Sequence, residues 1–229
     1  MVFLPCRAGS ERVPHKNTRP FGGFSQGLLG IKLAQLARVR GIAGVVLDSN
    51  DPTVLAIGRV WQQQWPEHSF LHVRERPDAL GNSGTTTDAL IEYALNTVSA
   101  DSLLWTHVTS PLVTPARYEA CLAAYDRALR SGHDSLMAVR PVRNFVWNAN
   151  GPCNYARDQL KWPRTQDLSP LYEVTSAVFL APMETARRCR DRIGDKPHLF
   201  EMSALEALDI DWEEDFAIAE AAFQRYAAL

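Results

Sequence analysis

Three cations lie in a short segment with glycine and serine directly after the first apolar run of the chain. The run covers residues 2–5, and the segment from Arg7 to Asn17 contains Gly9, Ser10, Arg12 and Lys16. Glycine lets the backbone approach a ligand closely, and the N–H groups of such a loop can line an anion-binding concavity. The two arginines and the lysine add charge that does not titrate near neutral pH. The segment predicts a phosphate-binding loop, with a solvated basic loop as the alternative.

A second group able to do chemistry lies near the C-terminus, in Leu208-Asp209-Ile210-Asp211. If this segment is a strand, alternation places both aspartates on one face and the two apolar residues toward the core. Two neighbouring carboxylates repel unless a cation lies between them, and hard oxygen ligands favour Mg²⁺ or Mn²⁺, with phosphate oxygens completing the shell. The alternative is that Asp211 caps the last helix and Glu214 closes the capping box. The residues alone favour neither reading.

The composition limits the class of protein. The chain has 229 residues, 46% hydrophobic and 22% charged, which fits one large domain or a domain with a small appendage. A net charge of −2 gives no general basis for binding nucleic acid or an anionic membrane. No segment approaches the roughly 18 apolar residues of a membrane span, and no signal peptide is visible. We expect a cytoplasmic protein whose Cys6, Cys121, Cys153 and Cys189, which form no C-x-x-C pair, are reduced thiols.

Apolar runs alternate with helical patterns, which predicts an α/β fold: a mainly parallel, Rossmann-like sheet with helices on both faces. Ligands of such sheets bind outside the carboxyl ends of the strands, where the cationic loop would lie. Thr85 with Asp88, and Thr114 before Pro115, are the expected helix caps. The expected strands are 2–4, 45–47, 70–73, 103–108, 135–139 and 176–180, and the expected helices are 28–39, 52 onward, 85–98, 115–131 and 212 onward, the last with Phe216, Ala219, Phe223 and Tyr226 on one face.

The rhythm breaks between residues 140 and 172, a segment we call the arm. It is rich in Asn, Pro, Gly and Trp, and it is too long for an ordinary connection. Aromatic side chains in a polar segment suggest an ordered excursion that finds a partner surface. We expect a single domain over residues 1–229, with the arm inserted for dimerisation and for contact with substrate.

The loop after the first strand is neither a Walker A motif nor G-x-G-x-x-G. It resembles the opening motif of the CMP-sugar synthetases, the acylneuraminate cytidylyltransferase family, which typically reads P-A-R-x-G-S-K-x-x-P-x-K-N. The match runs from Pro5 to Asn17, with Cys6 in place of Ala and Glu11 in place of a Lys that faces phosphate in relatives. Arg12 is expected to take over that role, with Glu11 turned away to pair with a basic neighbour.

Four further segments resemble the family in the same order along the chain. The resemblance implies nucleotide contacts from Arg7, Gly9, Ser10, Arg12, Lys16, Asn17, Arg76 and Thr87. It implies sugar contacts from His107, Thr109, Ser110, Arg164, Gln166 and Tyr172, and a catalytic metal held by Asp209 and Asp211. His107 and Val113 replace the family's Gln and Arg, and Thr175-Ser176-Ala177 replaces N-G-A. A buried structural histidine remains the alternative for His107, and helix capping remains the alternative for Thr85–Thr87.

The resemblance implies a homodimeric cytidylyltransferase that uses CTP, a 2-keto sugar acid and Mg²⁺ or Mn²⁺ to make a CMP-sugar and pyrophosphate for surface glycans. Arg7, Arg12, Lys16, Asp209 and Asp211 would be the catalytic residues. Sialic, legionaminic, pseudaminic and octulosonic acids all stay open as acceptors. Because Glu11, His107 and Val113 differ from the residues of the family motifs, two other hypotheses stay open. The chain could be a catalytically lapsed nucleotide-binding protein, or a nucleotidyltransferase that uses another NTP or sugar.

Overall fold

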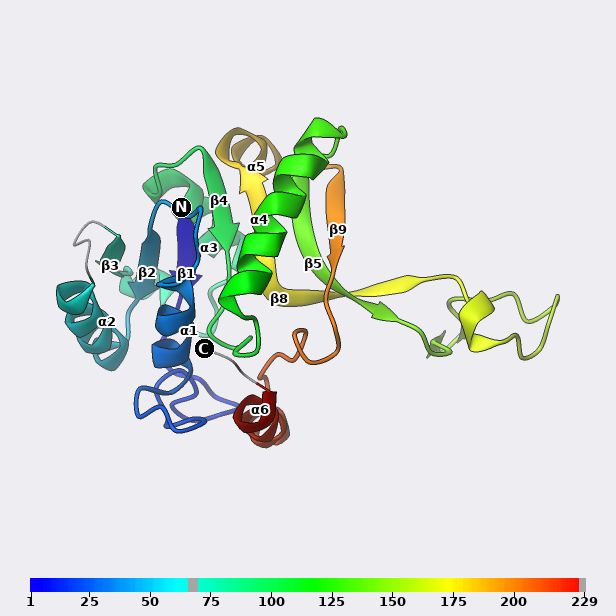
Figure 1. Cartoon of the computed structure of the whole chain (residues 1–229), viewed down its shortest axis with the longest axis horizontal. Helices are drawn as coiled ribbons and strands as arrows, with labels where there is room; N and C mark the ends of the chain where they lie inside the picture. The colour runs from blue at the N-terminus through cyan, green and yellow to red at the C-terminus, as the bar shows by residue number, and fades with distance from the viewer. Residues whose placement is uncertain (66–69, 227–229) are drawn as a thin grey trace.

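A seven-stranded sheet forms the centre of the molecule (Figure 1). The computed structural model describes residues 1–65 and 70–226. Of the strands in this sheet, β8 alone runs antiparallel to its neighbours β4 and β5. The predicted mainly parallel sheet is therefore confirmed. In spatial order the strands are β3 (Leu71–Glu75), β2 (Val45–Ser49), β1 (Val2–Pro5), β4 (Ser102–Trp105), β8 (Leu171–Pro182), β5 (Ser135–Val142) and β9 (Pro197–Glu201).

Helices cover both faces of this sheet, as predicted, because successive side chains of each strand point to opposite sides. In β1, Val2 and Leu4 join the larger core layer, whereas Phe3 joins the smaller one. The larger layer is covered by α1 (Gly27–Leu36), α2 (Pro52–Gln64), α4 (Pro115–Arg130) and α6 (Glu213–Tyr226), and the smaller one by α3 (Thr87–Thr97) and α5 (Met183–Cys189). No helix in residues 1–65 and 70–226 is long and apolar enough to cross a membrane.

Side-chain caps set where the helices begin. The Asp51 carboxylate accepts from the Thr53 amide before α2, and Thr114 accepts from Arg117 before α4, as expected. The prediction for α3 is wrong by one residue: Thr86, not Thr85, accepts from the amide of Ala89. The prediction that Glu214 closes a box at α6 is also wrong, because the Asp215 carboxylate accepts from the amides of Asp211 and Trp212.

Two elements of the C-terminal half escaped the sequence prediction. Helix α5 and strand β9 follow β8, and β9 pairs in parallel with β5 at the sheet edge. Residues 208–211 are not a strand, contrary to expectation, although Ile210 is fully buried. Tyr226 does not share the buried face of α6, because its side chain is 64% exposed and the core-facing residues are Phe216, Ala219 and Phe223. All four cysteines are free thiols.

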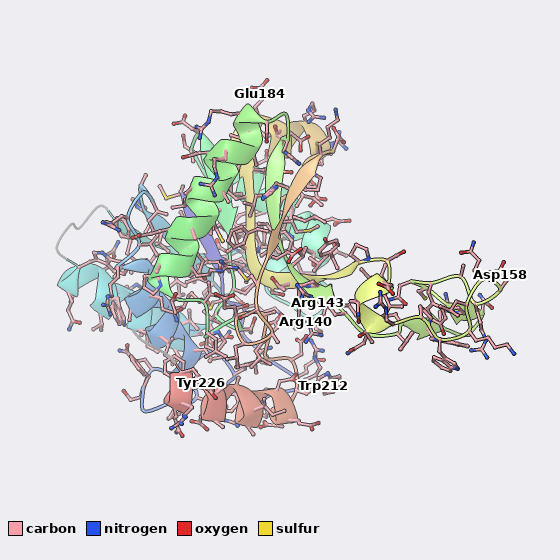
Figure 2. The ribbon with its side chains drawn as sticks, turned by 45° about the vertical axis from the view of Figure 1, so that its right-hand side comes forward. Arg140, Arg143, Asp158, Glu184, Trp212 and Tyr226 are labelled. Carbon is pink, nitrogen blue, oxygen red and sulfur yellow. The ribbon has the colours of Figure 1, made fainter. Side chains whose placement is uncertain are left out.

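The arm projects far from the sheet (Figure 1), with Arg140 and Arg143 at its root and Asp158 near its tip (Figure 2). Strands β5 and β8 continue into it as an antiparallel ribbon that pairs Val142 with Leu171. Beyond the ribbon lie the short strands β6 (Trp147–Asn148) and β7 (Gly151–Pro152) and a 3₁₀ turn at Thr165–Asp167. Another 3₁₀ turn, Asp78–Leu80, lies outside the arm, before α3.

The outer part of the arm is built around aromatic rings. Phe145 contacts Tyr155 and Trp162 edge-on at 5.3 Å, and Arg157 lies 5.4 Å from the rings of both Trp147 and Trp162. Trp147 and Trp162 are nevertheless 49% and 62% exposed in the single chain. The arm is thus an ordered structure with apolar surface left uncovered, which fits the homodimer prediction without testing it.

Candidate active site

The first and last motifs of the chain meet at one cavity of about 540 Å³ beyond the carboxyl ends of β1 and β4. Arg12 Nη2 lies 2.8 Å from Asp211 Oδ1. Lys16 Nζ donates to the Ile210 carbonyl at 2.6 Å and lies 3.9 Å from the same Asp211 oxygen. These contacts join residues almost 200 positions apart, so the fold brings Arg12 and Lys16 to Asp211. Arg7 and Asp209 line the same cavity. The cavity is lined by Arg7, Ser10, Glu11, Arg12, Lys16, Asn17, Arg76, Thr85, Thr86, Thr87, His107, Thr109, Ser176, Arg192, Asp209 and Asp211, with Pro5, Leu80, Leu90, Trp105 and Val108.

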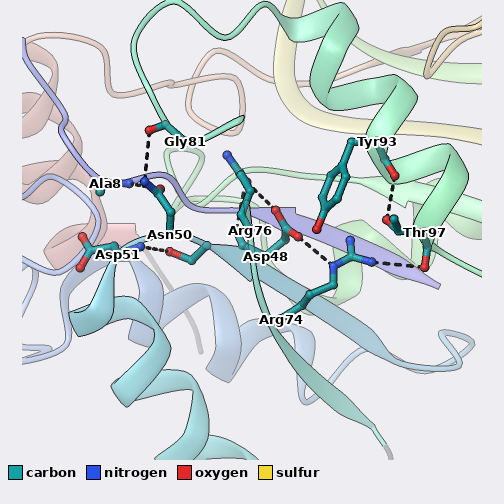
Figure 3. Close-up of polar contacts among 10 residues, drawn as sticks. Ala8, Asp48, Asn50, Asp51, Arg74, Arg76, Gly81, Tyr93 and Thr97 are labelled. Atoms are coloured by element: carbon teal, nitrogen blue, oxygen red, sulfur yellow. Dashed lines mark hydrogen bonds and ion pairs between the residues drawn. The ribbon is translucent and has the colours of Figure 1, made fainter. Parts of the chain in front are cut away.

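The loop between β1 and α1 has the backbone of an anion-binding concavity. Gly9 adopts φ +69°, which favours glycine, and open space surrounds the position its Cβ would take. The amides of residues 9–13 donate no hydrogen bond to any described residue. Asn50 fixes the base of the loop, since it accepts from the Ala8 amide and donates to the Gly81 carbonyl (Figure 3). Gly9 itself lines a smaller adjoining cavity together with Ser10 and Lys16.

A buried carboxylate that the sequence analysis missed holds Arg76. Asp48 is fully buried at the end of β2 and pairs with Arg76 at 2.5 Å and with Arg74 at 2.8 Å (Figure 3). Arg76 also donates to the Asp48 carbonyl, and its side chain is only 2% exposed. Arg76 therefore lines the cavity as part of a buried ion-pair cluster.

The last motif approaches the cavity from the far side. The Ile210 amide donates to the Thr109 carbonyl, which ties the segment to the loop after β4. Asp211 is 48% exposed, whereas Asp209 Oδ1 is buried and has no hydrogen-bond partner among the described residues. The two carboxylates line the same cavity without strand alternation, because the buried Ile210 between them anchors the backbone.

Lys16 is only 13% exposed in this setting. Burial lowers the pKa of its ammonium group, and the carboxylates of Asp211 and Asp209 partly offset that effect. The short bond to the Ile210 carbonyl fixes the ammonium group as a donor at the junction of the two motifs.

His107 is held on both sides of its ring. Trp105 Nε1 donates to His107 Nε2 at 3.0 Å, so the proton lies on Nδ1, which donates to the Ser176 carbonyl at 3.0 Å. The pKa of this imidazole is lowered to about 4, chiefly because the ring is buried. Arg192 and Lys16 also lower the pKa, whereas the bond to Ser176 and the carboxylate of Asp209 raise it. His107 is therefore neutral at pH 7.

Comparison with known proteins agrees with these motifs. No family model matches the chain. N-acylneuraminate cytidylyltransferase of Streptococcus agalactiae is 24% identical over 223 residues, 94% of this chain. Pseudaminic acid cytidylyltransferase of Campylobacter jejuni is 22% identical over 232 residues, 96% of this chain and 94% of the relative. The chain is thus similar in sequence to N-acylneuraminate and pseudaminic acid cytidylyltransferases. It spans about half (51%) of the length of the S. agalactiae protein.

Solved structures support the fold of the chain. CMP:2-keto-3-deoxy-manno-octonic acid synthetase, solved in complex with CTP, has a TM-score of 0.68 at 14% identity and covers 98% of both chains. The 4-diphosphocytidyl-2C-methyl-D-erythritol synthase of Anaerococcus prevotii has a TM-score of 0.70 at 13% identity over 98% of this chain and 95% of its own. At these identities the likeness concerns the fold alone.

Several predicted residues have partners that limit what they can contact. Asn17 Nδ2 donates to the Arg7 carbonyl at 3.2 Å, which leaves its carbonyl oxygen for a ligand. Thr87 is the first residue of α3, while the Thr85 hydroxyl is buried without a partner among the described residues. Glu11 is exposed at the cavity and forms no ion pair within the described chain, so the expected pairing with a basic neighbour is wrong.

Some residues predicted to contact the sugar lie elsewhere in the single chain. Ser110 is 1% exposed beneath the cavity, and its carbonyl accepts from the buried Lys32 ammonium group at 2.9 Å. Arg164 pairs with Asp167 within the arm. Gln166 and Tyr172 line a separate cavity at the root of the arm, together with Glu201. The roles predicted for the three arm residues would require the arm to reach another protomer.

Two cations near the site were not predicted. Lys32 lies in α1 without a carboxylate partner among the described residues, and burial lowers its pKa to about 7. Arg192 lies after α5, an element that the sequence did not reveal, and its side chain lines the main cavity beside His107. A lone arginine without a surrounding motif gives no signal in the sequence.

The carboxylate pair suits a divalent cation. The unpartnered Asp209 oxygen and the half-exposed Asp211 are hard oxygen donors of the kind that Mg²⁺ and Mn²⁺ prefer. No group of three or more potential ligands among His, Cys, Asp and Glu occurs in the described part of the chain. Two protein carboxylates would leave the remaining positions to substrate oxygens and water, as in many nucleotide-dependent sites.

Proposed function

We propose that this chain is a cytidylyltransferase that transfers CMP from CTP to a 2-keto sugar acid and releases pyrophosphate. The observation that carries the proposal is the meeting of Arg12 and Lys16 with Asp209 and Asp211 at one cavity, with Arg12 and Asp211 at 2.8 Å. The similarity to the S. agalactiae and C. jejuni proteins over more than nine tenths of the chain supports it.

The reaction needs an in-line displacement at phosphorus. The anomeric hydroxyl of the acceptor forms a new oxygen–phosphorus bond at the α-phosphate, and the bond to the bridging oxygen breaks. Pyrophosphate leaves with that electron pair, and the hydroxyl proton passes to solvent. Such a transfer depends on positioning and charge neutralisation more than on covalent chemistry by the protein.

The loop after β1 would hold the triphosphate. The unengaged amides of residues 9–13 and the side chains of Arg7 and Arg12 offer donors to phosphate oxygens. Arg12 is half exposed and stacks 5.0 Å from the Trp212 ring, so its guanidinium is oriented before any ligand arrives. Lys16 adds a fixed positive charge where the leaving group would develop negative charge.

Asp209 and Asp211 would hold the divalent ion. When bound, Mg²⁺ or Mn²⁺ supplies Lewis-acid polarisation of the phosphate and lowers the pKa of a coordinated hydroxyl. Asp211 would exchange its contact with Arg12 for the cation, which frees Arg12 for phosphate. The buried Asp209 oxygen needs no such exchange.

His107 does not suit the role of general base. Both ring nitrogens are engaged in hydrogen bonds, and Nε2, the one that could accept a proton, already accepts the hydrogen bond from Trp105 Nε1. With a pKa of about 4, the ring is a weak base at neutral pH. Its place beside Thr109 instead suits a wall of the acceptor site.

The nucleotide base would lie between α3 and the loop. Asn17 keeps one amide oxygen for the exocyclic amine of cytosine, and Thr87 offers a hydroxyl from the start of α3. Asp48 holds Arg76 in place, and the guanidinium N–H groups that do not bond to Asp48 would donate to the nucleotide.

The test is pyrophosphate release from each of the four NTPs with a panel of sialic, legionaminic, pseudaminic and octulosonic acids. We expect turnover with CTP and at least one acid, and loss of turnover in Asp211→Asn. Asp126→Asn is the matched control, because Asp126 is exposed on α4 and away from the cavity. Absence of turnover with every acid, despite CTP binding by calorimetry, would favour the lapsed nucleotide-binding protein that Glu11 suggests. Turnover with another NTP or with a sugar phosphate would favour a different nucleotidyltransferase.

We further propose a homodimer in which the arm of each protomer brings Arg164, Gln166 and Tyr172 to the cavity of the other. The uncovered tryptophans of the arm support this arrangement, and so does the lining of the main cavity, which includes none of these three residues in the described single chain. Light scattering after size exclusion should give twice the chain mass of 25.6 kDa. Mixing Asp211→Asn with Arg164→Ala protomers should restore part of the activity that each lacks alone; a monomer at micromolar concentration would refute the arrangement.

A further inference from the structure

Arg192 adds a cation to the lining of the cavity. Its guanidinium lies 3.8 Å from the Phe179 ring and 5.6 Å from the Trp105 ring. The side chain lines the cavity next to His107 and Ser176. The Arg192 guanidinium forms no ion pair and no hydrogen bond with any described residue. None of the eleven ion pairs in the described part of the chain includes it.

Most other cations around the cavity have a carboxylate partner: Arg12 and Lys16 face Asp211, and Arg76 faces Asp48. Arg7 also lacks a partner among the described residues, but it is exposed in the loop after β1, whereas Arg192 is packed against two aromatic rings. Arg192 has only the carboxylate of Asp191 acting on it at a distance, and that carboxylate accepts from the Arg192 backbone amide. Burial lowers the pKa of the guanidinium, so the position favours an arriving anion that would replace the missing partner.

The two aromatic rings fix the direction of the guanidinium. Arginine stacks on aromatic faces and presents a planar fork of donors, which matches the two oxygens of a carboxylate. A side chain held this way loses little further freedom when a ligand binds, which strengthens binding. The neighbouring imidazole of His107 is neutral at pH 7 and offers no competing charge.

We propose that Arg192 binds the carboxylate of the acceptor sugar acid and thereby selects acid acceptors over neutral sugars. This inference rests on the proposed function. The triphosphate already has Arg7, Arg12, Lys16 and the loop amides, whereas Arg192 packs against Trp105 and Phe179 of the smaller core layer and lines the cavity with His107 and Ser176. An acceptor carboxylate is adjacent to the anomeric carbon in a 2-keto acid, so anchoring it also orients the attacking hydroxyl.

The test compares the panel acid of lowest KM with its methyl ester, which keeps the sugar but removes the charge. Binding of each is measured by competition in wild type, Arg192→Gln and Arg192→Lys, and CTP affinity is measured by calorimetry in the same variants. Arg190→Gln is the matched control, because Arg190 is exposed in the same segment and lies outside the cavity. Thermal melting and CTP affinity report whether each variant folds.

Wild type should prefer the acid to the ester by about 10- to 100-fold, the range of one charged hydrogen-bonded contact. Arg192→Gln should lose that preference with CTP affinity unchanged, Arg192→Lys should keep part of it, and Arg190→Gln should behave as wild type. An undiminished preference in Arg192→Gln would overturn the inference, as would weakened CTP binding with the acid unaffected, which would assign Arg192 to the nucleotide. If wild type turns over no acid at all, the proposed function itself fails and the inference falls with it.

Discussion

The residues that would bind the triphosphate and those that would bind the acceptor have different surroundings in the cavity. At the end that would hold triphosphate, Arg12 and Lys16 face Asp211, and a loop of unengaged amides lies beside them. At the end that would hold the acceptor, Arg192 forms no ion pair with any described residue, and His107 has both ring nitrogens engaged. The first end matches the family motifs closely, whereas the second departs from them.

The difference reflects what each end has to recognise. Phosphate chemistry is the same for every acceptor, so it calls for the same cations, amides and carboxylates. Acceptors differ in their substituents, and an end that chooses among them is free to use different residues. Changes at the first end should therefore alter turnover, and changes at the second end should alter acceptor choice or stability.

The largest effect is expected from the carboxylates. Asp209→Asn and Asp211→Asn should each lower kcat on the order of 100-fold or more, because each removes charge that positions the divalent ion. Rates are measured by pyrophosphate release across a Mg²⁺ titration. Near-normal rates in either variant at saturating Mg²⁺ would rule out its role as a ligand.

A smaller but diagnostic difference is expected between two neighbours in the loop. Arg12→Ala should lower kcat/KM for CTP about 10- to 100-fold, since it removes a charged contact to phosphate. Glu11→Ala should change it about twofold or less, because Glu11 is exposed and forms no ion pair with any described residue. Arg12→Lys should retain part of the activity. Equal losses in Arg12→Ala and Glu11→Ala would contradict the assignment.

At the acceptor end, His107 should appear in the pH dependence of stability. The pKa of His107 in the folded chain is about 4, below the ordinary value of 6.5. Between these values the unfolded chain binds a proton that the folded chain does not, so stability falls as pH decreases from about 6.5 toward 4.

Glutamine can keep both contacts of His107 without titrating. His107→Gln should therefore lose less stability than wild type between pH 7 and pH 5, by on the order of 1–2 kcal/mol in urea unfolding. An identical decrease in the two proteins would show that His107 does not contribute this proton linkage.

The smallest effect concerns the wall of the nucleotide end. Thr86→Ala should lower the free energy of unfolding by about 1 kcal/mol, because it removes the cap of α3. Thr85→Ala should cost less than half of that, since the Thr85 hydroxyl has no partner among the described residues. Urea denaturation of both variants checks the difference, and the reverse order would restore Thr85 as the cap.

The sequence predicted much of the fold because its signals are local. The buried runs at β1 and β2 and the Thr114-Pro115 start of α4 require only neighbouring residues to be read. The same holds for the loop after β1, where glycine and cations lie within eleven positions. The segment 208–211 was read as a strand because apolar and acidic residues alternate, but the contact of Ile210 with the loop after β4 decided its shape instead.

By itself the sequence determined the type of fold, the glycine-containing cationic loop after β1 and the presence of an aspartate pair, since each depends on residues close together in the chain. Only the tertiary structure decided that Arg12 meets Asp211, that Asp48 fixes Arg76, and that Arg192 enters the cavity from the α5 side. Each of these contacts joins segments separated by tens to hundreds of residues, or depends on an element without a local pattern. Packing against the sheet, which acts on side chains from all of these segments at once, supplies that information.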